Sequence, residues 1–553
     1  MKRRDALVWV WSWLWALVAL LLSAAEAAER GAALYETHCA GCHDGATPRA
    51  PPKSLLAIMA SGAVLRALES GVMARYAEAL SGAERRALVT HLTGRAPAPP
   101  GESLTAPSCA QPARAGSGPD VRGWGVELDN RRHFDETVTA LSAATLADLE
   151  LKWAFAYPNA LRARSQPAVM GDTLFVGGQD GSVFALDKRT GCVRWRFQTV
   201  AEVRTGIVIG PRGGLNERVL LYFGDLIGNL YALDAKHGTL VWRDRPDQHP
   251  SLTLTAAPAL HEGVLYVPLS SLEVTEAADP HYACCTFQGG VAAYAAESGR
   301  QLWKGRTIDQ SPSVVGQNAA GTDRLAPSGA PVWNTPSIDA ERGLLYVGTG
   351  ENYSSPANAF SDAIVALRLD TGAIAWHRQM TAGDAWNMGC ETAARINCPP
   401  EDGPDFDFGA ATIIARDGEG RDVLLAGQKS GHVYALDLSR RGALRWRRKL
   451  GRGRAFCQPG ISAAATSIPG AVLGGAMDGV LRAYAADTGA VLWAFDTARE
   501  FAATDGGAAR GGSMGGASGA VPSGDMLFVN SGYGIYFHMP GAALLAFGLK
   551  TEQ

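Results

Sequence analysis

Two cysteines and a histidine lie close together near the N-terminus, in the order Cys39-Ala-Gly-Cys42-His43. Two thiols at this spacing can add to the two vinyl groups of a haem, and the adjacent imidazole can reach the iron. A redox-active or zinc-binding cysteine pair is the alternative, but neither needs a histidine directly after the second cysteine. We therefore expect one covalently attached haem c, with His43 as an iron ligand and electron transfer as part of the function.

A haem that accepts electrons at high potential needs a thioether as its sixth iron ligand. Met59 and Met73 are the candidates. Met73 follows Gly71 in a turn-like stretch and lies 30 residues after His43, which leaves enough chain to cross the haem. We favour Met73, although either methionine can instead pack in the core.

The segment around these residues has the pattern of a small helical domain. Gly31-Ala-Ala-Leu-Tyr35 approaches the haem motif with a helix-like pattern. Ser81-Gly-Ala-Glu84 is a capping box, and it begins an apolar-periodic helix that ends near Gly94. We predict an all-α cytochrome c domain over residues 29–95. A linker rich in Pro, Gly and Ser is predicted over residues 96–120.

Residues 1–28 have the pattern of an export signal. Three basic residues at positions 2–4 precede an apolar run from Ala6 to Leu22, and Ala25-Glu-Ala27 is typical of a cleavage site. The apolar run is slightly short for a membrane span. We expect cleavage of the signal, a periplasmic protein and no stable membrane span after cleavage; a retained membrane anchor is the alternative.

Charge and cysteine content narrow the partners and the compartment. The net charge is −3 with 19% charged residues, so nucleic acid is not an expected partner. Nine cysteines in an exported chain permit disulfides. Besides the haem motif an odd number remains, namely Cys109, Cys192, Cys284, Cys285, Cys390, Cys398 and Cys457. We expect Cys390 to pair with Cys398 across one short loop.

One pattern recurs from about residue 150 onward: an apolar strand, Ala-Leu-Asp or a variant, Thr/Ser-Gly, and then Trp four residues after the Gly. The copies end at Gly191/Trp195, Gly238/Trp242, Gly299/Trp303, Gly372/Trp376, Gly442/Trp446 and Gly489/Trp493. Such a repeat predicts the four-stranded blades of a β-propeller, with Asp and Gly in the hairpin turn and Trp packed between neighbouring blades. A strand at 151–155 and an orphan Leu544-Leu-Ala-Phe547 are expected to complete the last blade together.

This repeat resembles the tryptophan-docking motif of the quinoprotein alcohol dehydrogenases, which bind pyrroloquinoline quinone (PQQ). With the fused haem domain, the chain resembles the polyvinyl-alcohol dehydrogenase (cytochrome) family over nearly everything after the signal. Stretches similar to blocks of that family include Trp124–Asn130, Leu151–Phe155, Gly348–Tyr353 and Ala426–Gly431. The resemblance implies an all-β propeller of the PQQ type over residues 121–553.

The number of blades departs from the resembled enzymes. Trp153 and the six copies predict seven blades, whereas the family has eight. The gap lies after Trp446, where the chain runs from Leu450 to Cys457 and enters the next blade at once. A lost blade would change the angles around the ring, so it also bears on whether a quinone can bind.

The resemblance implies which residues hold the quinone. Pro331-Val-Trp333 matches the segment whose Trp forms the floor under the quinone, and Lys429 lies where the family places an Arg or Lys against the quinone carbonyls. Packing of Trp333 between blades and a solvated Lys429 are the alternatives. Further quinone contacts are implied at Thr255, Ser270, Arg204 and the adjacent pair Cys284-Cys285. Related enzymes stack a disulfide ring of two adjacent cysteines on the quinone, but in a different blade.

The resemblance also implies a calcium site and a catalytic base. Glu273 matches the family's calcium-binding Glu, and Glu351-Asn352 matches a Gly-Asn ligand site, at which spacing favours Glu351 and residue type favours Asn352. Asp384 matches the catalytic Asp and can also bind calcium. Ca²⁺ needs hard oxygen ligands, and a carboxylate can take the proton of an alcohol. An ordinary loop acid at Glu273 and a turn residue at Asp384 are the alternatives.

The function implied is oxidation of secondary alcohol groups, perhaps on a polymer, with electrons leaving through haem c to an external cytochrome. Two alternatives remain open. One is a non-catalytic propeller scaffold, which would need neither a haem nor calcium-binding carboxylates. The other is a haem-bearing propeller that has lost quinone binding and acts as an electron carrier.

Overall fold

The computed structural model describes residues 29–44, 47–98, 107–110, 119–210, 218–449, 462–516, 518–536 and 538–550. The chain divides into two compact units, Met1–Glu102 and Ser103–Gln553, and each is considered by itself. The predicted signal at residues 1–28, Cys457 and the predicted blade gap near 450–457 lie outside the described residues. Among the residues that are described, no helix is both long and apolar enough to cross a membrane.

The first unit is helical. Residues 29–38 are helical and are followed by α2 (Ala40–His43), α3 (Lys53–Ala57), α4 (Ser61–Glu69), η1 (Ala74–Tyr76) and α5 (Gly82–Thr93). The predicted capping box at Ser81 and Glu84 begins α5, and Gly94 ends it in the left-handed conformation with φ 65°. Gly31 lies directly against the backbone of Ala87, where a Cβ would overlap the Ala87 carbonyl. The first helix and α5 therefore cross closely at Gly31.

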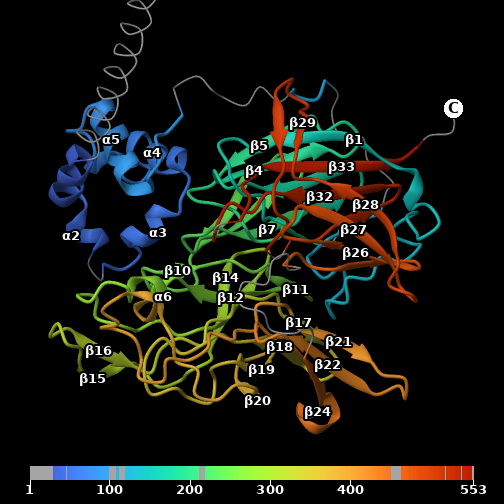
Figure 1. Ribbon diagram of the computed structural model, residues 1–553. Helices are drawn as coiled ribbons and strands as arrows, with labels where there is room; N and C mark the ends of the chain where they lie inside the picture. The colour runs from blue at the N-terminus through green and yellow to red at the C-terminus, as the bar shows by residue number, and fades with distance from the viewer. Residues whose placement is uncertain are drawn as a thin grey trace, which may run out of the picture. The chain divides into compact units, whose positions relative to one another are not determined.

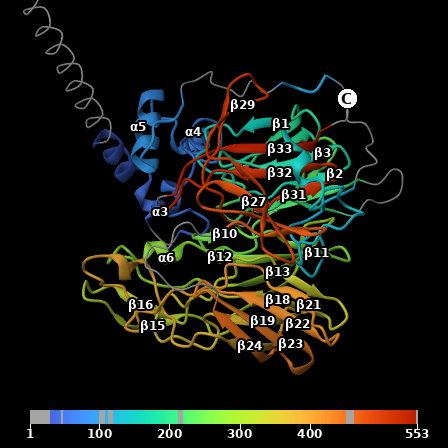
Figure 2. The same ribbon diagram turned by 45° about the vertical axis from the view of Figure 1, so that its right-hand side comes forward.

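The second unit is a seven-bladed propeller in the part that the structure describes (Figures 1 and 2). Each blade is an antiparallel sheet of four strands, and β11 adds a short fifth strand to blade 3. Blades 1 to 3 consist of β2 (Ala168–Met170), β3 (Thr173–Gly177), β4 (Ser182–Asp187) and β5 (Val193–Gln198); β6 (Val208–Ile209), β7 (Leu220–Gly224), β8 (Leu230–Asp234) and β9 (Leu240–Asp244); and β10 (Leu252–Thr253), β11 (Ala259–His261), β12 (Val264–Ser271), β13 (Gly290–Ala295) and β14 (Arg300–Arg306).

Blades 4 to 7 continue the same order. They consist of β17 (Ser337–Asp339), β18 (Leu344–Gly348), β19 (Ala363–Arg368) and β20 (Ile374–Gln379); β21 (Ile413–Arg416), β22 (Asp422–Gly427), β23 (His432–Asp437) and β24 (Ala443–Lys449); β25 (Thr466–Ile468), β26 (Ala471–Gly475), β27 (Val480–Ala485) and β28 (Val491–Asp496); and β31 (Val521–Ser523), β32 (Met526–Ser531), β33 (Ala543–Leu549) and β1 (Leu149–Ala156). Two hairpins lie outside the blades, formed by β15 (Ser313–Gln317) with β16 (Asp323–Ala326) and by β29 (Glu500–Ala502) with β30 (Ala508–Arg510). Short helical segments η2 (Leu146–Asp148), α6 (Glu273–Glu276), η3 (Met388–Glu391) and η4 (Leu438–Arg440) lie in the connections.

The ring closes by pairing the two ends of the propeller. Strand β1 pairs with β33, with Phe155 opposite Leu544, which confirms the prediction for the last blade. The segment before β1 connects two blades by backbone pairing. Val121 pairs with Val169 of β2, and His133 pairs with Ser467 of β25. The buried guanidinium of Arg132 binds backbone and side-chain oxygens of several blades.

Tryptophans dock between neighbouring blades, as the repeat predicts. Each docked indole covers the turn glycine of the next blade and leaves no room for a Cβ there: Trp153 on Gly191, Trp195 on Gly238, Trp242 on Gly299, Trp303 on Gly372 and Trp376 on Gly442. The indole N–H of Trp242 also donates to the carbonyl of Ala296, 2.9 Å away. The glycine is needed because each turn has a positive φ and a face covered by an aromatic ring.

The docking pattern breaks between blades 5 and 6. Trp446 on β24 is 46% exposed, and no described atom lies within 4 Å of a Cβ built at Gly489. Residues 450–461, which lie between these two blades in the sequence, are outside the described residues. The break is at the place where the sequence predicts a missing blade, so one blade-to-blade contact differs from the five others.

Candidate active site

Five carboxylic acids and one lysine lie close together in the connections of blades 4 and 5. They are Glu351, Asp362, Asp384, Asp405, Asp407 and Lys429. Glu351 follows β18, and Asp405 and Asp407 precede β21. Lys429 lies in the turn between β22 and β23, and its backbone N–H donates to the carbonyl of Asp407, 3.0 Å away. The backbone N–H of Glu351 donates to Asp407 Oδ1 at 3.0 Å. The turns are thus tied to each other by the same residues that carry the charged groups.

The lysine is outnumbered by the acids around it. Lys429 Nζ lies 2.8 Å from Asp405 Oδ1 and 2.8 Å from Asp407 Oδ2. One oxygen each of Glu351, Asp405 and Asp407 lie within 4.8 Å of one another. Glu351 is 4% exposed, and its Oε2 has no hydrogen-bond partner among the described residues. Three carboxylates with one cation leave an excess of negative charge that a divalent ion would balance.

The protonation of these acids differs according to their surroundings. Burial, followed by the charge of Asp407, raises the pKa of Glu351 well above its usual value. Burial opposes ionisation of Asp407 as well, but its hydrogen bond with Glu351 and the charge of Lys429 outweigh burial and lower its pKa. Burial and the nearby Asp407 raise the pKa of Asp405 to about 6. Without a metal ion, Glu351 and Asp407 therefore share one proton.

Trp333 lies beside the acids, in the segment before β17. Its indole N–H donates to Asp407 Oδ2 at 3.2 Å, and Lys429 Nζ is 5.5 Å from the centre of its ring. Gly409 lies against the ring, where a Cβ would overlap the indole. The structure brings Trp333, Lys429 and Glu351 together, as the resemblance implied. An aromatic surface next to a cation and carboxylates suits a flat, electron-poor ligand.

Asp384 lies in the same connection as Asp405 and Asp407, between β20 and β21. Its carboxylate is fully buried and accepts the backbone N–H groups of Asp405 at 3.3 Å and Phe406 at 2.9 Å. Burial, followed by the neighbouring Asp384, raises the pKa of Asp362 to about 10, so Asp362 is protonated and neutral near the Asp384 carboxylate. This arrangement fixes the chain that carries Asp405 and Asp407, and it leaves Asp384 enclosed.

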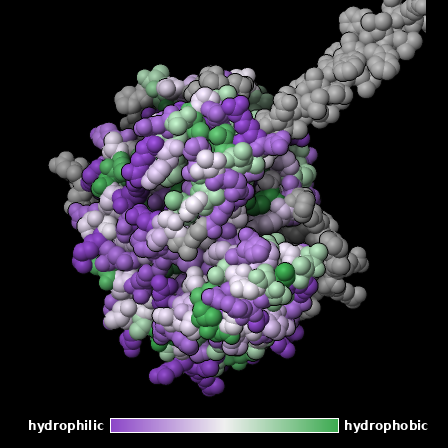
Figure 3. All heavy atoms as spheres, turned by 90° about the vertical axis from the view of Figure 1, so that its left-hand side faces the viewer, coloured by the Kyte–Doolittle hydropathy of each residue, from purple (hydrophilic) through white to green (hydrophobic). Residues whose placement is uncertain are grey.

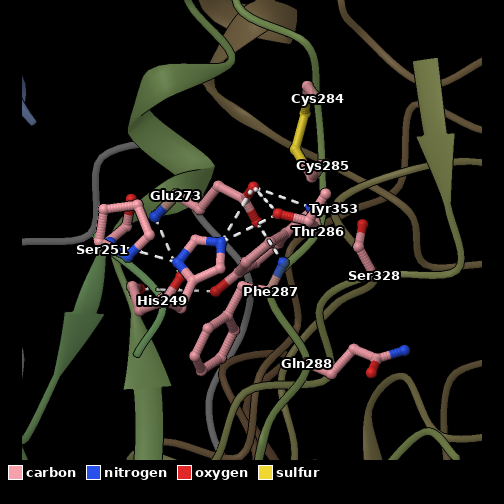
Figure 4. Close-up of polar contacts among 12 residues, drawn as sticks. His249, Ser251, Glu273, Cys284, Cys285, Thr286, Phe287, Gln288, Ser328 and Tyr353 are labelled. Atoms are coloured by element: carbon pink, nitrogen blue, oxygen red, sulfur yellow. Dashed lines mark hydrogen bonds and ion pairs between the residues drawn. A yellow bond between two sulfur atoms is a disulfide. The ribbon is translucent and has the colours of Figure 1, made fainter. Parts of the chain in front are cut away.

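Glu273 occupies a separate group of hydrogen bonds at the start of α6 (Figure 4). Its carboxylate is fully buried and accepts bonds from the hydroxyl of Tyr282 at 2.9 Å, from the backbone N–H of Thr286 at 2.8 Å and from that of Phe287 at 2.7 Å. His249 Nε2 lies 3.5 Å from Glu273 Oε1. These groups occupy both of its oxygens, and Glu273 as a calcium ligand stays a prediction.

Asn352 is also satisfied by the protein. Its side-chain oxygen accepts the N–H of Asn358 at 2.7 Å, and its amide donates to the carbonyl of Ser328 at 2.9 Å. Of the two predicted ligands at this site, Glu351 has a free oxygen and Asn352 does not. The geometry therefore favours Glu351.

Blades 2 and 3 carry the other residues implied to bind a quinone. Thr255 Oγ1 is buried without a hydrogen-bond partner among the described residues. The carbonyl of Leu269 accepts the N–H of Val332 at 3.0 Å. Ser270 and Trp333 are the next residues of these two segments, so this hydrogen bond brings their backbones near each other. Arg204 has no acceptor among the described residues, and burial together with the charge of Arg164 lowers its pKa to about 10. Buried donors without partners are expected where a polar ligand binds.

Three disulfides form among the described residues of the second unit. Cys390 bonds to Cys398, which confirms the predicted pairing, and Cys284 bonds to Cys285, the adjacent pair that the resemblance implied as a quinone contact. Cys109 bonds to Cys192, a pairing that the sequence left open, and Ser108 pairs with Val193 of β5. Residues 107–110 of the predicted linker therefore belong to the propeller. The Cys284–Cys285 pair is buried near Asn387, whose amide donates to Cys284 Sγ at 3.9 Å.

The haem motif lies in the helical unit. Cys39 and Cys42 are free thiols, the first partly buried and the second exposed. His43 Nδ1 lies 2.6 Å from the carbonyl oxygen of Pro51. If Nδ1 carries the proton, this contact leaves Nε2 as the free ring nitrogen, the state that a metal-binding histidine needs. Met59 is 3% exposed, whereas Met73 is partly exposed at the start of η1. Met73 as sixth ligand stays a prediction.

Comparison with known proteins identifies the family. Residues 129–441 match the family model described as PQQ, the glucose/ethanol/alcohol dehydrogenase β-propeller domain. The chain is 35% identical to a polyvinylalcohol dehydrogenase from Pseudomonas sp., over 95% of this chain and 93% of that protein. The chain belongs to the polyvinylalcohol dehydrogenase family. A second polyvinylalcohol dehydrogenase, from Sphingopyxis sp. strain 113P3, is 33% identical over 91% of this chain and 89% of its own length.

Membership in this family makes the chain an enzyme, an alcohol dehydrogenase of the PQQ type, as the sequence predicted. Solved structures agree on the fold. The quinohemoprotein alcohol dehydrogenase from Comamonas testosteroni has a TM-score of 0.57 at 20% identity, over 80% of this chain and 82% of that one. A europium-containing methanol dehydrogenase has a TM-score of 0.55 at 17% identity, over 78% and 98%.

Sequence reasoning missed three acids of the site. Asp362, Asp405 and Asp407 lie in connections that carry no copy of the repeat. The available signal is the stretch Asp405-Phe-Asp-Phe408, which places two acids on one side of an extended segment just before a strand. The resemblance implied Asp384 instead, because the local sequence around it matches the family's catalytic-Asp loop.

Proposed function

We propose that this chain oxidises secondary alcohol groups of polyvinyl alcohol or a similar polyol with PQQ and Ca²⁺, and that the electrons leave through haem c to an external cytochrome. The family assignment supports an alcohol as substrate. The observation that carries the proposal is the group formed by Glu351, Asp405, Asp407, Lys429 and Trp333. It combines a cation site, a proton acceptor and an aromatic surface within one set of turns.

Asp405 is the base in this proposal, in place of Asp384. A general base must reach the proton that it removes. The side chain of Asp405 is 31% exposed, whereas Asp384 is fully buried with both oxygens bonded to backbone N–H groups. Lys429 forms an ion pair with the Asp405 carboxylate. Asp384 then has a positioning role, because it fixes the backbone of Asp405 and Phe406.

The other residues bind and orient the cofactor. Trp333 offers the flat surface, and Lys429 a positive charge over it. Thr255, Ser270 and Arg204 supply donors for the carboxylates of PQQ. When bound, PQQ supplies a carbonyl that accepts hydride from the alcohol carbon. The unpartnered donors of this group and the exposed part of Lys429 fit such a ligand.

Calcium fits Glu351 and Asp407. Ca²⁺ is held by oxygen ligands, and Glu351 Oε2 is a buried oxygen without a partner among the described residues. Bound Ca²⁺ supplies positive charge that polarises a carbonyl oxygen. Asp405 lies close enough to add a further oxygen.

Replacing Glu351 by glutamine is expected to weaken calcium binding at least about ten-fold, because the change removes one ligand charge from the site. Titration calorimetry of the PQQ-free protein with Ca²⁺ measures the effect. The exposed Glu419→Gln is the matched control and should bind calcium as the natural protein does. Equal calcium affinity in Glu351→Gln and the natural protein would show that the cation site lies elsewhere.

The helical unit fits a cytochrome c domain with one covalent haem. Cys39 and Cys42 are free to bond, and the contact of His43 Nδ1 with Pro51 leaves Nε2 for the iron. A bound haem supplies one-electron transfer, which an external cytochrome can accept. Three disulfides in the propeller favour an oxidising compartment, and together with the predicted signal they support the periplasm.

One observation favours a second candidate function. Among the described residues Trp446 does not cover Gly489, which is consistent with a propeller that keeps its haem but has lost quinone binding, and that acts as an electron carrier or scaffold. The complete group of Trp333, Lys429 and the acids argues for the enzyme, because a carrier would have no need of it.

Alcohol-dependent reduction of a dye by the purified full-length protein distinguishes the two functions. With PQQ and Ca²⁺ added, secondary alcohols should reduce the dye, and omission of either should abolish the reaction. Binding of PQQ is followed in parallel by fluorescence quenching. The carrier predicts neither PQQ binding nor dye reduction, and that result would overturn the proposed enzyme.

A further inference from the structure

A cavity of about 250 Å³ lies beside the candidate active site. Its walls come from the β15–β16 hairpin, from the turn that follows Glu351 and from the loop closed by the Cys390–Cys398 disulfide. Cys284, Tyr353, Pro356, Pro399 and Pro400 are among the residues that line it. Tyr353 is two residues beyond Glu351 in the sequence, so the turn that follows Glu351 also contributes to the cavity wall.

Arg324 lines this cavity, and one of its guanidinium donors, Nε, is buried without an acceptor among the described residues. The side chain of Arg324 makes no hydrogen bond or ion pair with a described residue. Its backbone pairs with that of Cys284. A guanidinium carries five N–H donors in a fixed plane. A buried donor of this kind without an acceptor is costly, and a bound oxygen would satisfy it.

The rest of the lining is apolar or neutral. Three proline rings and the exposed Val315 offer hydrocarbon surface, and Ser354 and Ser355 offer hydroxyl groups. Glu401 accepts a bond from Ser355 Oγ at 2.8 Å and from the N–H of Ala357 at 3.1 Å, so the rim holds one acid as well as one cation. A long neutral molecule in which methylene and hydroxyl groups alternate fits this lining better than an anion.

The surface around these elements is not one broad apolar patch. The space-filling view of the side that carries the β15–β16 hairpin shows hydrophobic residues in small groups among hydrophilic ones (Figure 3). A partner protein that docks through a large apolar face would need a continuous patch. The apolar lining of the cavity is instead suited to a thin chain.

We infer that this cavity is a subsite for the stretch of polyol chain next to the alcohol group that reacts. Arg324 donates to a hydroxyl oxygen of the chain, and the methylene groups pack on Pro356, Pro399 and Pro400. This inference rests on the proposed function, and it makes the chain length of the substrate a determinant of KM. Small secondary alcohols do not reach Arg324 and are bound by the acid group alone.

Binding and turnover of Arg324→Met test the subsite. Calorimetry on the full-length protein without PQQ uses oligomers of vinyl alcohol, and Arg300→Met, an exposed arginine of β14, is the matched control. Arg324→Met should bind oligomers about ten-fold more weakly, and Arg300→Met should equal the natural protein. With PQQ and Ca²⁺, the KM for the polymer should rise about ten-fold in Arg324→Met, while kcat/KM for butan-2-ol stays the same.

The outcomes separate the subsite from the proposed function. Equal oligomer affinity in Arg324→Met and the natural protein overturns the subsite, whether or not alcohols are oxidised. Binding of oligomers that depends on Arg324, without oxidation of any alcohol, supports the subsite and overturns the proposed function. Binding of glutarate that depends on Arg324, with no binding of oligomers, shows an anion site and overturns the polyol assignment.

Discussion

Replacing Asp405 by asparagine is expected to lower the turnover of a secondary alcohol by about 10²- to 10⁴-fold. Asparagine keeps an oxygen at the same place but cannot take the proton of the alcohol. PQQ binding should persist, because Trp333 and Arg204 are unchanged. Dye-linked turnover at saturating PQQ and Ca²⁺ measures the loss, and quenching of tryptophan fluorescence measures PQQ binding.

Two variants of similar chemistry make the test specific. Asp370→Asn, in an exposed turn, should keep full turnover. Asp384→Asn should lose less activity than Asp405→Asn, because an amide oxygen can still accept one of the two backbone N–H groups. The opposite order, with an active Asp405→Asn and an inactive Asp384→Asn of native stability, would return the role of base to Asp384.

Replacing Trp242 by alanine is expected to lower the free energy of unfolding by about 3 kcal/mol. The indole fills the space over Gly299 and stacks on Tyr294, with ring centres 6.3 Å apart. Its removal leaves a cavity between blades 2 and 3 and an unsatisfied carbonyl at Ala296. Urea unfolding followed by circular dichroism measures the change.

Trp446→Ala is the matched control because Trp446 belongs to the same repeat but is 46% exposed. Its replacement should change the free energy of unfolding by about 0.5 kcal/mol or less. A loss for Trp446→Ala as large as that for Trp242→Ala would mean that Trp446 is packed in solution, and that the contact between blades 5 and 6 is closed.

The propeller could be predicted from the sequence because the residues that specify each blade lie close together in the chain. A turn glycine and a tryptophan four residues later form one hairpin and one contact with the next blade, so Gly238 and Trp242 specify their own blade. The number of blades follows from counting the copies. The same local reasoning placed the capping box of α5 at Ser81 and the Cys390–Cys398 disulfide.

The site could be predicted only in part, because its residues lie in connections whose path depends on the whole ring. Lys429 and Glu351 follow strands of the repeat and Trp333 precedes one, and their positions could be matched. Asp405 lies beyond a loop of 20 residues after Asp384, and nothing in that loop shows which of the two acids faces Lys429. The surroundings of Glu273 could not be predicted for the same reason. The backbone N–H groups of Thr286 and Phe287, at the far end of the same connection, donate to its carboxylate.

Reduction of the protein's own haem by polyvinyl alcohol tests the central claim most directly. The full-length protein, loaded with PQQ and Ca²⁺ and kept free of oxygen, is mixed with the polymer while the haem absorption is recorded. The account predicts reduction of the haem in the natural protein and none in Asp405→Asn, whose haem dithionite still reduces. An oxidised haem in PQQ-loaded natural protein with every secondary alcohol tried would contradict it.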